Sequence, residues 1–227
     1  GQVWAFLHSG SRGVGNKIAQ RFIARAQRLA EQRRRHLPHR DLAYFTEDDE
    51  DHHRYLDHLH WAQEFARLNR EVMMDRTLDE LGRFMDEDVR QVERVACHHN
   101  YTVTEEHFGA EVLVSRKGAI DAHAGVPGLI PGSMGTASYV VTGKGEPMSL
   151  CSAPHGAGRV YSRSRARKTF SQVDLRRRMT GIEYRDMPDF VDEIPDAYKD
   201  IDAVMADAAD LVQVDHVLHQ LLNVKGQ

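Results

Sequence analysis

The sequence contains few cysteines and no long hydrophobic run. Its 227 residues include two cysteines, Cys97 and Cys151, which lie far apart and form no Cys-x-x-Cys pair. This excludes a disulfide framework and zinc-ribbon spacing, and it favours a reducing compartment, so we expect a cytoplasmic protein. No apolar stretch has the length needed to cross a membrane and no signal peptide is recognisable, so we expect no membrane partner.

The sequence also lacks a strong charge of one sign and the common phosphate-binding motifs. The formal net charge is -4, so a polyanion would have to be bound by local basic patches. Residues 10–15 have the spacing G-x-x-G-x-G, which differs from the dinucleotide motif G-x-G-x-x-G. No G-x-x-x-x-G-K-[ST] motif occurs. These absences exclude a Rossmann or P-loop interpretation.

Three glycine-rich elements are present instead, and two of them combine histidine with arginine. Residues 155–159 read His-Gly-Ala-Gly-Arg, residues 8–15 read His-Ser-Gly-Ser-Arg-Gly-Val-Gly, and residues 131–135 read Pro-Gly-Ser-Met-Gly. An imidazole can act as a nucleophile or ligand, small residues let a phosphate approach the backbone, and arginine supplies fixed positive charge. Three such elements in one chain predict a single phosphate site.

The first half of the chain is predicted to be mainly helical. The apolar run at residues 3–7 is typical of a buried strand. The helix that follows has apolar residues at helical spacing: Ile18, Phe22, Ile23, Ala26 and Leu29. Further helices are expected at about residues 55–74 and 77–95, the second opening with a capping-box pattern, so that Ala96 and Cys97 end a helix.

The second half is predicted to be richer in strands, at residues 111–114, 120–122, 139–142 and 148–152, with a hairpin turn at 116–119. Helices are expected at about 164–170 and 195–209, and residues 211–224 favour a strand, with a helix as the alternative. The pattern predicts an α+β fold, with mixed sheets and surrounding helices, as a single domain over residues 1–227. Because the first strand has no preceding structure beside it, we interpret the chain as N-terminally truncated.

The sequence has 14 histidines, and with only two thiols any transition metal would be held by nitrogen and oxygen ligands. His8 ends the predicted first strand, where ligands are often placed, and we expect at most one of His98 and His99 to bind an ion. His8 and His99 together would supply two imidazoles to one divalent cation. Imidazole ligands alone are equally compatible with zinc, iron or nickel.

Five motifs, taken in order, resemble the RtcB-type RNA-splicing ligases. They are His8-Ser9-Gly10-Ser11-Arg12-Gly13, Cys97-His98-His99-Asn100-Tyr101, Pro131-Gly132-Ser133-Met134-Gly135, His155-Gly156-Ala157-Gly158-Arg159 and Val224-Lys225-Gly226. The resemblance covers essentially the whole chain and corresponds to the C-terminal portion of that family. Five motifs in register are far more specific than any one of them.

The resemblance implies an RtcB-like fold and a GTP- and manganese-dependent RNA ligase. Such a ligase joins RNA 3′-phosphate or 2′,3′-cyclic phosphate ends to 5′-hydroxyl ends, as in tRNA splicing and RNA repair. It further implies that His155 carries GMP covalently and that His8 and His99 hold one manganese ion. The residues that would surround the guanylate are Asn100, Pro131, Gly132, Ser133, Met134, Ser138, Gly156, Ala157, Gly158 and Lys225.

Residue type, more than the resemblance, suggests Arg12, Arg159 and Arg163 as contacts to RNA phosphates.

The sequence departs from the family at its beginning, because the Asp, Cys and His that hold the family's other manganese have no counterpart here. Two alternatives follow. The chain is a truncated, non-catalytic RNA- or nucleotide-binding remnant, or it is a metal-dependent phosphohydrolase that activates water rather than forming a histidine adduct.

Overall fold

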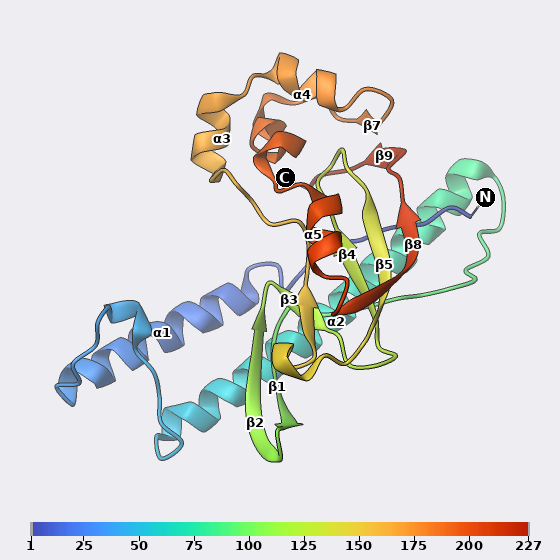
Figure 1. Ribbon diagram of the computed structural model, residues 1–227. Coiled ribbons are helices and arrows are strands. Elements are labelled where there is room, and N and C mark those ends of the chain that lie inside the picture. Colours follow the sequence, from blue (N-terminus) through green and yellow to red (C-terminus); the bar gives the residue numbers. More distant parts are fainter. Residues whose placement is uncertain (1, 227) are drawn as a thin grey trace. The chain divides into compact units, whose positions relative to one another are not determined.

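The computed structural model describes residues 2–226 (Figure 1). The chain divides into two compact units, residues 1–92 and residues 93–227. Each unit buries its own set of apolar side chains. The expectation of a single domain over residues 1–227 stays a prediction.

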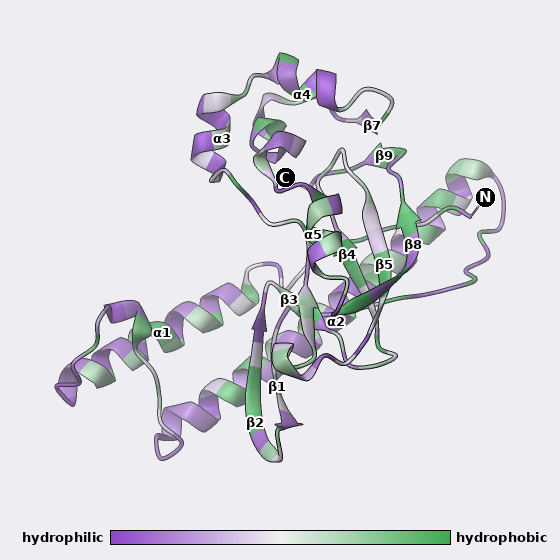
Figure 2. Cartoon of the chain, in the orientation of Figure 1, coloured by the Kyte–Doolittle hydropathy of each residue, from purple (hydrophilic) through white to green (hydrophobic). Residues whose placement is uncertain are grey.

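The first unit is built on two helices, α1 (Val14–Gln32) and α2 (Glu50–Met85), with the short 3-10 helix η1 (Arg40–Leu42) between them. The helix predicted here is confirmed as α1, in which the predicted apolar residues Phe22 and Ala26 are buried whereas Ile23 is 52% exposed. The ring of Phe22 packs against that of Tyr55 in α2 at a centroid distance of 5.3 Å. Figure 2 shows hydrophobic and hydrophilic residues alternating along both helices.

Two predictions for this half of the chain are wrong. Residues 2–10 form no strand, and Val3 is 80% exposed, because no strand among the described residues pairs with this segment. The helices predicted at 55–74 and 77–95 are one helix, α2, in which the Thr77 hydroxyl donates to the carbonyl of Met73 at 2.8 Å instead of capping a new helix. Helix α2 ends at Asp86, whose φ of 52° is left-handed, so Cys97 follows an irregular segment and not a helix.

The second unit begins with the antiparallel hairpin of β1 (Asn100–His107) and β2 (Ala110–Lys117). Its two turn residues, Phe108 and Gly109, have φ of 53° and 76°, as a tight hairpin turn with right-handed strand twist requires. The hairpin predicted at residues 116–119 is wrong, because β2 pairs with β1 whereas β3 (Ala119–Asp121) pairs with β6 (Ser152–Pro154). The chain passes from one sheet to another at Gly118.

A three-stranded antiparallel sheet in the order β4-β5-β8 lies at the centre of this unit. Its strands are β4 (Pro127–Pro131), β5 (Ser138–Gly143) and β8 (Val212–Leu218). The strands predicted at 111–114, 120–122 and 139–142 are confirmed, but β1 and β4 were not predicted. The strand predicted at 148–152 is mostly the 3-10 helix η2 (Pro147–Ser149) and a turn, in which Met148 is 81% exposed.

Two buried clusters hold the second unit together. One lies around the central sheet and includes Ile120, Ile130, Val141 and, from α5 (Ile201–Asp207), Ile201. Burying one such side chain contributes about 1.5–3 kcal/mol. The other joins the remaining helices and turns: α3 (Arg163–Thr169), α4 (Gln172–Arg178), η3 (Pro188–Glu193) and η4 (Pro195–Ala197).

The second unit also contains a small parallel pair, β7 (Glu183–Tyr184) and β9 (Leu222–Asn223). Helices and several small sheets together confirm the predicted α+β class. Among residues 2–226, no helix combines the length and apolar content needed to span a bilayer.

The N-terminus of α2 generates a prediction about acid stability. The backbone N–H of Thr46 donates to the buried carboxylate of Asp49, and this bond, with the Thr46 hydroxyl and the guanidinium of Arg33, lowers the Asp49 pKa to about 2. An unfolded aspartate has a pKa of about 3.9, so the stabilisation is present above that pH and is lost as the pH falls toward 2. Asp49→Asn should therefore lower the melting temperature clearly at pH 6 and progressively less between pH 4 and pH 2.

The matched control is Asp57→Asn, which changes an exposed carboxylate in the same helix and should have little effect at any pH. Equal losses for Asp49→Asn at pH 6 and at pH 2 would contradict the prediction.

Candidate active site

His155 immediately follows β6, and the pairing of β6 with β3 places it beside Gly118. The Nδ1 atom of His155 lies 2.8 Å from the carbonyl oxygen of Gly118. A carbonyl oxygen can only accept a hydrogen bond, so Nδ1 carries the proton and the lone pair of the neutral ring is on Nε2. The contact therefore fixes the tautomer in which Nε2 can act as a nucleophile.

Gly118 connects His155 to the end of the irregular segment before β1. Its N–H is shared between the carbonyl of His99 at 2.7 Å and Oδ1 of Asn100 at 3.1 Å. The rings of His99 and His155 have centroids 4.7 Å apart. The structure thus brings together three of the predicted site residues, His99, Asn100 and His155, around one glycine.

Gly156, the residue after His155, allows close packing on the last residue of β4. A Cβ at Gly156 would lie 2.9 Å from the carbonyl oxygen of Pro131, and that oxygen accepts the N–H of Ala157 at 3.2 Å. Pro131 in turn pairs with Ser138, which is buried at the start of β5. The Pro131 and His155 elements, 24 residues apart in the sequence, are therefore neighbours.

The turn between β4 and β5 is held by its own polar groups. The Ser133 N–H donates to the Thr136 hydroxyl at 2.6 Å, and a Cβ at Gly132 would lie 2.4 Å from the carbonyl of Ala137. The side chain of Met134 is buried in the second apolar cluster, and that of Ala157 in the first. Any contact of these two residues with a nucleotide must come from their backbone.

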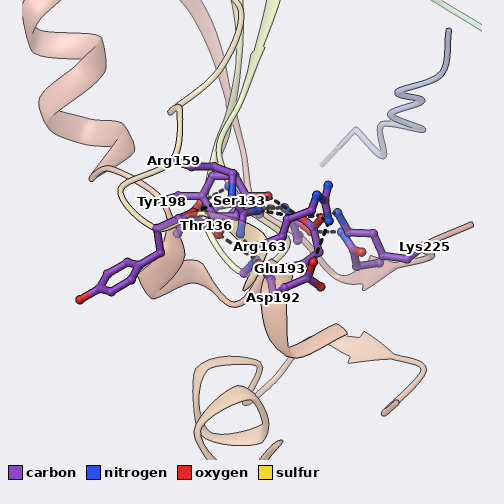
Figure 3. A network of polar contacts seen from close by, with 12 residues as sticks. Ser133, Thr136, Arg159, Arg163, Asp192, Glu193, Tyr198 and Lys225 are labelled. Carbon is purple, nitrogen blue, oxygen red and sulfur yellow. Dashed lines mark hydrogen bonds and ion pairs between the residues drawn. The ribbon is translucent and has the colours of Figure 1, made fainter. Parts of the chain in front are cut away.

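Arg159 and Arg163 lie in a network of cations and carboxylates with Lys225 (Figure 3). Arg159 donates to the hydroxyl of Tyr198 at 2.8 Å, and Arg163 pairs with Asp192 at 3.0 Å. Lys225 lies 3.4 Å from Glu193, which also pairs with Arg163. Arg167 reaches Asp192 at 3.3 Å, so four cations face two carboxylates and a positive surplus remains.

The electrostatics of this network favour an ionised Glu193 and a protonated Tyr198. Burial by itself raises the pKa of Glu193, but the hydrogen bond from Tyr198 and the charges of Lys225 and Arg163 outweigh it and lower the pKa. Burial and the neighbouring Glu193 raise the pKa of Tyr198 to about 12. The Tyr198 hydroxyl therefore remains a hydrogen-bond donor at neutral pH.

His8 and Arg12 belong to the first unit, whereas His99 and His155 belong to the second. Both His8 and Arg12 are exposed, and Arg12 has a φ of 51° in the turn before α1. The Ser11 hydroxyl accepts the N–H of Gly15 in this turn at 3.0 Å. The joint binding of one ion by His8 and His99 stays a prediction, as does the contact of Arg12 with RNA.

Sequence reasoning missed several charged residues of the second unit. It did not predict that Asp192 and Glu193 oppose the arginines, and it did not single out Tyr198. It also missed a possible metal-binding group of Glu105, His107 and His123. The spacing of Glu105 and His107, two apart on a strand, was a usable signal, because residues i and i+2 share a face.

Comparison with known proteins agrees with the resemblance that the sequence motifs carry. Residues 1–226 match the family described as tRNA-splicing ligase RtcB. The RNA-splicing ligase RtcB of Escherichia coli K12 is 50% identical over 230 residues, which are 99% of this chain and 56% of the relative. The tRNA-splicing ligases RtcB of Nanoarchaeum equitans and Aeropyrum pernix are 32% and 33% identical, each covering 90% of this chain and 48% of the relative.

The matched proteins are named as RNA-splicing ligases, and in this chain the histidine pair His99 and His155 lies beside a glycine on an α+β fold. The chain belongs to the RtcB family. It spans about half the length of the curated relatives it matches.

The geometry around Gly118 predicts how His155 responds to substitution. In Gly118→Ala, the new Cβ would lie 3.3 Å from both Cε1 and Nδ1 of His155, on a residue whose φ of 71° is already unfavourable for alanine. We expect the His155 ring to shift, with altered imidazole signals in a long-range ¹H–¹⁵N spectrum.

The matched control is Gly109→Ala, at a φ of 76° with nothing within 4 Å of the added Cβ. Both variants should lose about 1–2 kcal/mol of unfolding free energy from backbone strain. Only Gly118→Ala should move the His155 signals, and an identical spectrum in the two variants would sink the prediction.

Proposed function

We propose that this chain carries the nucleotide-transfer site of a GTP-dependent RNA ligase. The ligase joins an RNA 3′-phosphate or 2′,3′-cyclic phosphate end to a 5′-hydroxyl end, as in tRNA splicing and RNA repair. The observation that carries the proposal is the hydrogen bond from His155 Nδ1 to the Gly118 carbonyl, with His99 beside the ring. Membership of the RtcB family supports it.

The chemistry follows from the lone pair on Nε2 of His155. Nε2 attacks the α-phosphorus of GTP, an N–P bond forms, the bond from phosphorus to the bridging oxygen breaks, and pyrophosphate leaves. An oxygen of the RNA 3′-phosphate then attacks the same phosphorus and displaces the imidazole. Finally the RNA 5′-hydroxyl attacks the activated 3′-phosphate, loses its proton to solvent and releases GMP.

His99 and His8 are the residues that would hold a manganese ion. Imidazole suits divalent transition metals, and His99 lies directly beside the nucleophile, which fits an ion placed at the reacting phosphate. When bound, the ion offsets the negative charge that builds on the phosphate oxygens. The chain itself supplies the nucleophile and its orientation.

The segments around His155 fit a guanylate-binding role. Glycines and short side chains allow a phosphate or a base to approach the backbone closely. The residues proposed to surround the guanylate are Asn100, Pro131, Gly132, Ser133, Met134, Ser138, Gly156, Ala157, Gly158 and Lys225. The contacts of Gly156 and Ala157 with Pro131 support the proposal, because they bring two of these segments together.

The basic network is proposed to bind the RNA phosphates through Arg159 and Arg163, with Arg12 as a further contact. The surplus of cations over carboxylates leaves a positive region that can attract a polyanion although the whole chain is weakly acidic.

Cys97 and Cys151 are free thiols, which is consistent with a cytoplasmic site of action.

The decisive test of the proposal is transfer of radioactive label from [α-³²P]GTP to the protein in the presence of manganese. The wild-type chain should acquire an acid-labile, base-stable label, as expected for an N–P bond, and His155→Ala should acquire none. His219→Ala is the control, because it removes an exposed histidine of the same unit and should be labelled normally.

The chain is also tested after fusion to the part of the Escherichia coli relative that it does not cover, since it spans only 56% of that protein. Label in the fusion alone would assign His155 the same role within a longer ligase. Absence of label in both would overturn the proposal and favour the non-catalytic remnant. Release of GMP or phosphate without an adduct would favour the phosphohydrolase.

The proposed RNA contact is tested separately through its salt dependence. Each phosphate neutralised on a single strand contributes about 0.7 to the slope of log K against log salt concentration. Arg163→Ala should lower the magnitude of this slope by about that amount in binding to a single-stranded RNA with a 3′-phosphate. Arg176→Ala, at a similarly exposed arginine paired with Asp186, should leave the slope unchanged, and the reverse pattern would contradict the assignment.

A further inference from the structure

A second group of metal-ligating side chains lies outside the proposed ligase site. Glu105 and His107 share one face of β1, and His123 follows β3. One ligand atom from each of the three lies within 4.8 Å of the others. None of them belongs to the residues proposed to hold manganese, guanylate or RNA.

Two of the three side chains are protected from solvent, and their facing atoms lie close to coordination distance. The side chains of His107 and Glu105 are 6% and 12% exposed, and His107 Nε2 donates to Glu105 Oε2 at 2.8 Å. In a tetrahedral zinc site, metal–ligand distances of about 2.0–2.2 Å place neighbouring ligand atoms roughly 3.3 Å apart. If an ion replaces the proton between His107 Nε2 and Glu105 Oε2, these two atoms therefore need to move apart by only about half an ångström.

The third ligand is oriented by a carboxylate. Nδ1 of His123 lies 2.6 Å from Oδ1 of Asp121, which also accepts the backbone N–H of His123 at 2.9 Å. This arrangement holds the proton on Nδ1 and leaves Nε2 to bind a metal. A carboxylate behind a histidine is the usual outer partner of a metal-binding imidazole.

Arg116 holds the carboxylate of Glu105 from the other side. Its guanidinium donates to Oε1 at 2.6 Å and to Oε2 at 2.9 Å, and its side chain is 1% exposed. A carboxylate offers about four lone-pair sites, of which the guanidinium takes two and His107 takes one. Glu105 and Asp121 carry two negative charges against the single charge of Arg116, so the group retains one negative charge that favours a cation.

We propose that Glu105, His107 and His123 form a structural site for a divalent transition metal of the zinc type. Two nitrogen ligands and one oxygen ligand favour zinc over calcium or magnesium, which prefer oxygen alone. Water completes the coordination. The ion cross-links β1 to the segment after β3.

Hydrogen bonds from Arg116 link this site to the segment that precedes His155. Arg116 also donates to the hydroxyl of Ser152 and to the carbonyl of Leu150, each at 2.9 Å. Ser152 begins β6, which leads directly to His155. A metal that fixes Glu105 therefore also fixes the arginine that anchors this strand.

The proposal is tested by zinc titration of the chelator-treated chain, with metal content measured by mass spectrometry and melting temperature measured in parallel. The wild-type chain should bind one more equivalent of zinc than His123→Gln. Zinc should raise the melting temperature of the wild type more than that of this variant. His123 is the primary choice because its side chain is 39% exposed, so the variant is expected to fold.

Three further variants sharpen the result. Asp121→Asn should retain the site with about 10–100-fold weaker binding, as expected for an outer partner. His99→Gln should keep the equivalent of zinc that His123→Gln loses, which distinguishes this site from the proposed manganese site. His219→Gln should bind as much zinc as the wild type. Equal zinc content in wild type and His123→Gln, or loss of the equivalent in His99→Gln instead, would overturn the proposal.

Discussion

The candidate active site depends on one hydrogen bond, from Nδ1 of His155 to the carbonyl of Gly118. An imidazole has two nitrogens, and only the one without a proton can attack phosphorus. By accepting a hydrogen bond from Nδ1, the carbonyl leaves Nε2 unprotonated as the atom of this ring that is able to act as a nucleophile. The N–H of Gly118 also donates to the backbone carbonyl of His99, which holds the segment that carries His99 beside the His155 ring.

Local sequence patterns predicted those parts of the fold that depend on local physics. Helix α1 follows from apolar residues at helical spacing, and Phe22 and Ala26 are buried as expected. Strand β1 was missed because its buried residues, Thr102 and His107, are polar and give no hydrophobic alternation. A strand at 148–152 was expected from apolar residues, but Leu150 adopts a left-handed φ of 50°, which a strand cannot contain.

The site was partly predictable for a related reason. The motifs identified His99, Asn100 and His155, and the pairing of β3 with β6 brings them together. The partners of the basic residues were not predictable, because Asp192 and Glu193 lie about 30 residues from the arginines they bind and belong to no motif. His123 could not be predicted as a partner of Glu105 either, because the two residues come close only in the tertiary structure.

The pKa values of the basic network limit which groups can make anion binding depend on pH. With the pKa of Tyr198 raised to about 12, that of Glu193 lowered and that of Arg163 raised, these three groups keep their charge states throughout the neutral range. Their attraction for an anion is then constant between mildly acidic and mildly alkaline solution. Any response to proton concentration in that interval must originate elsewhere, and imidazoles are the side chains whose ordinary titration range falls there.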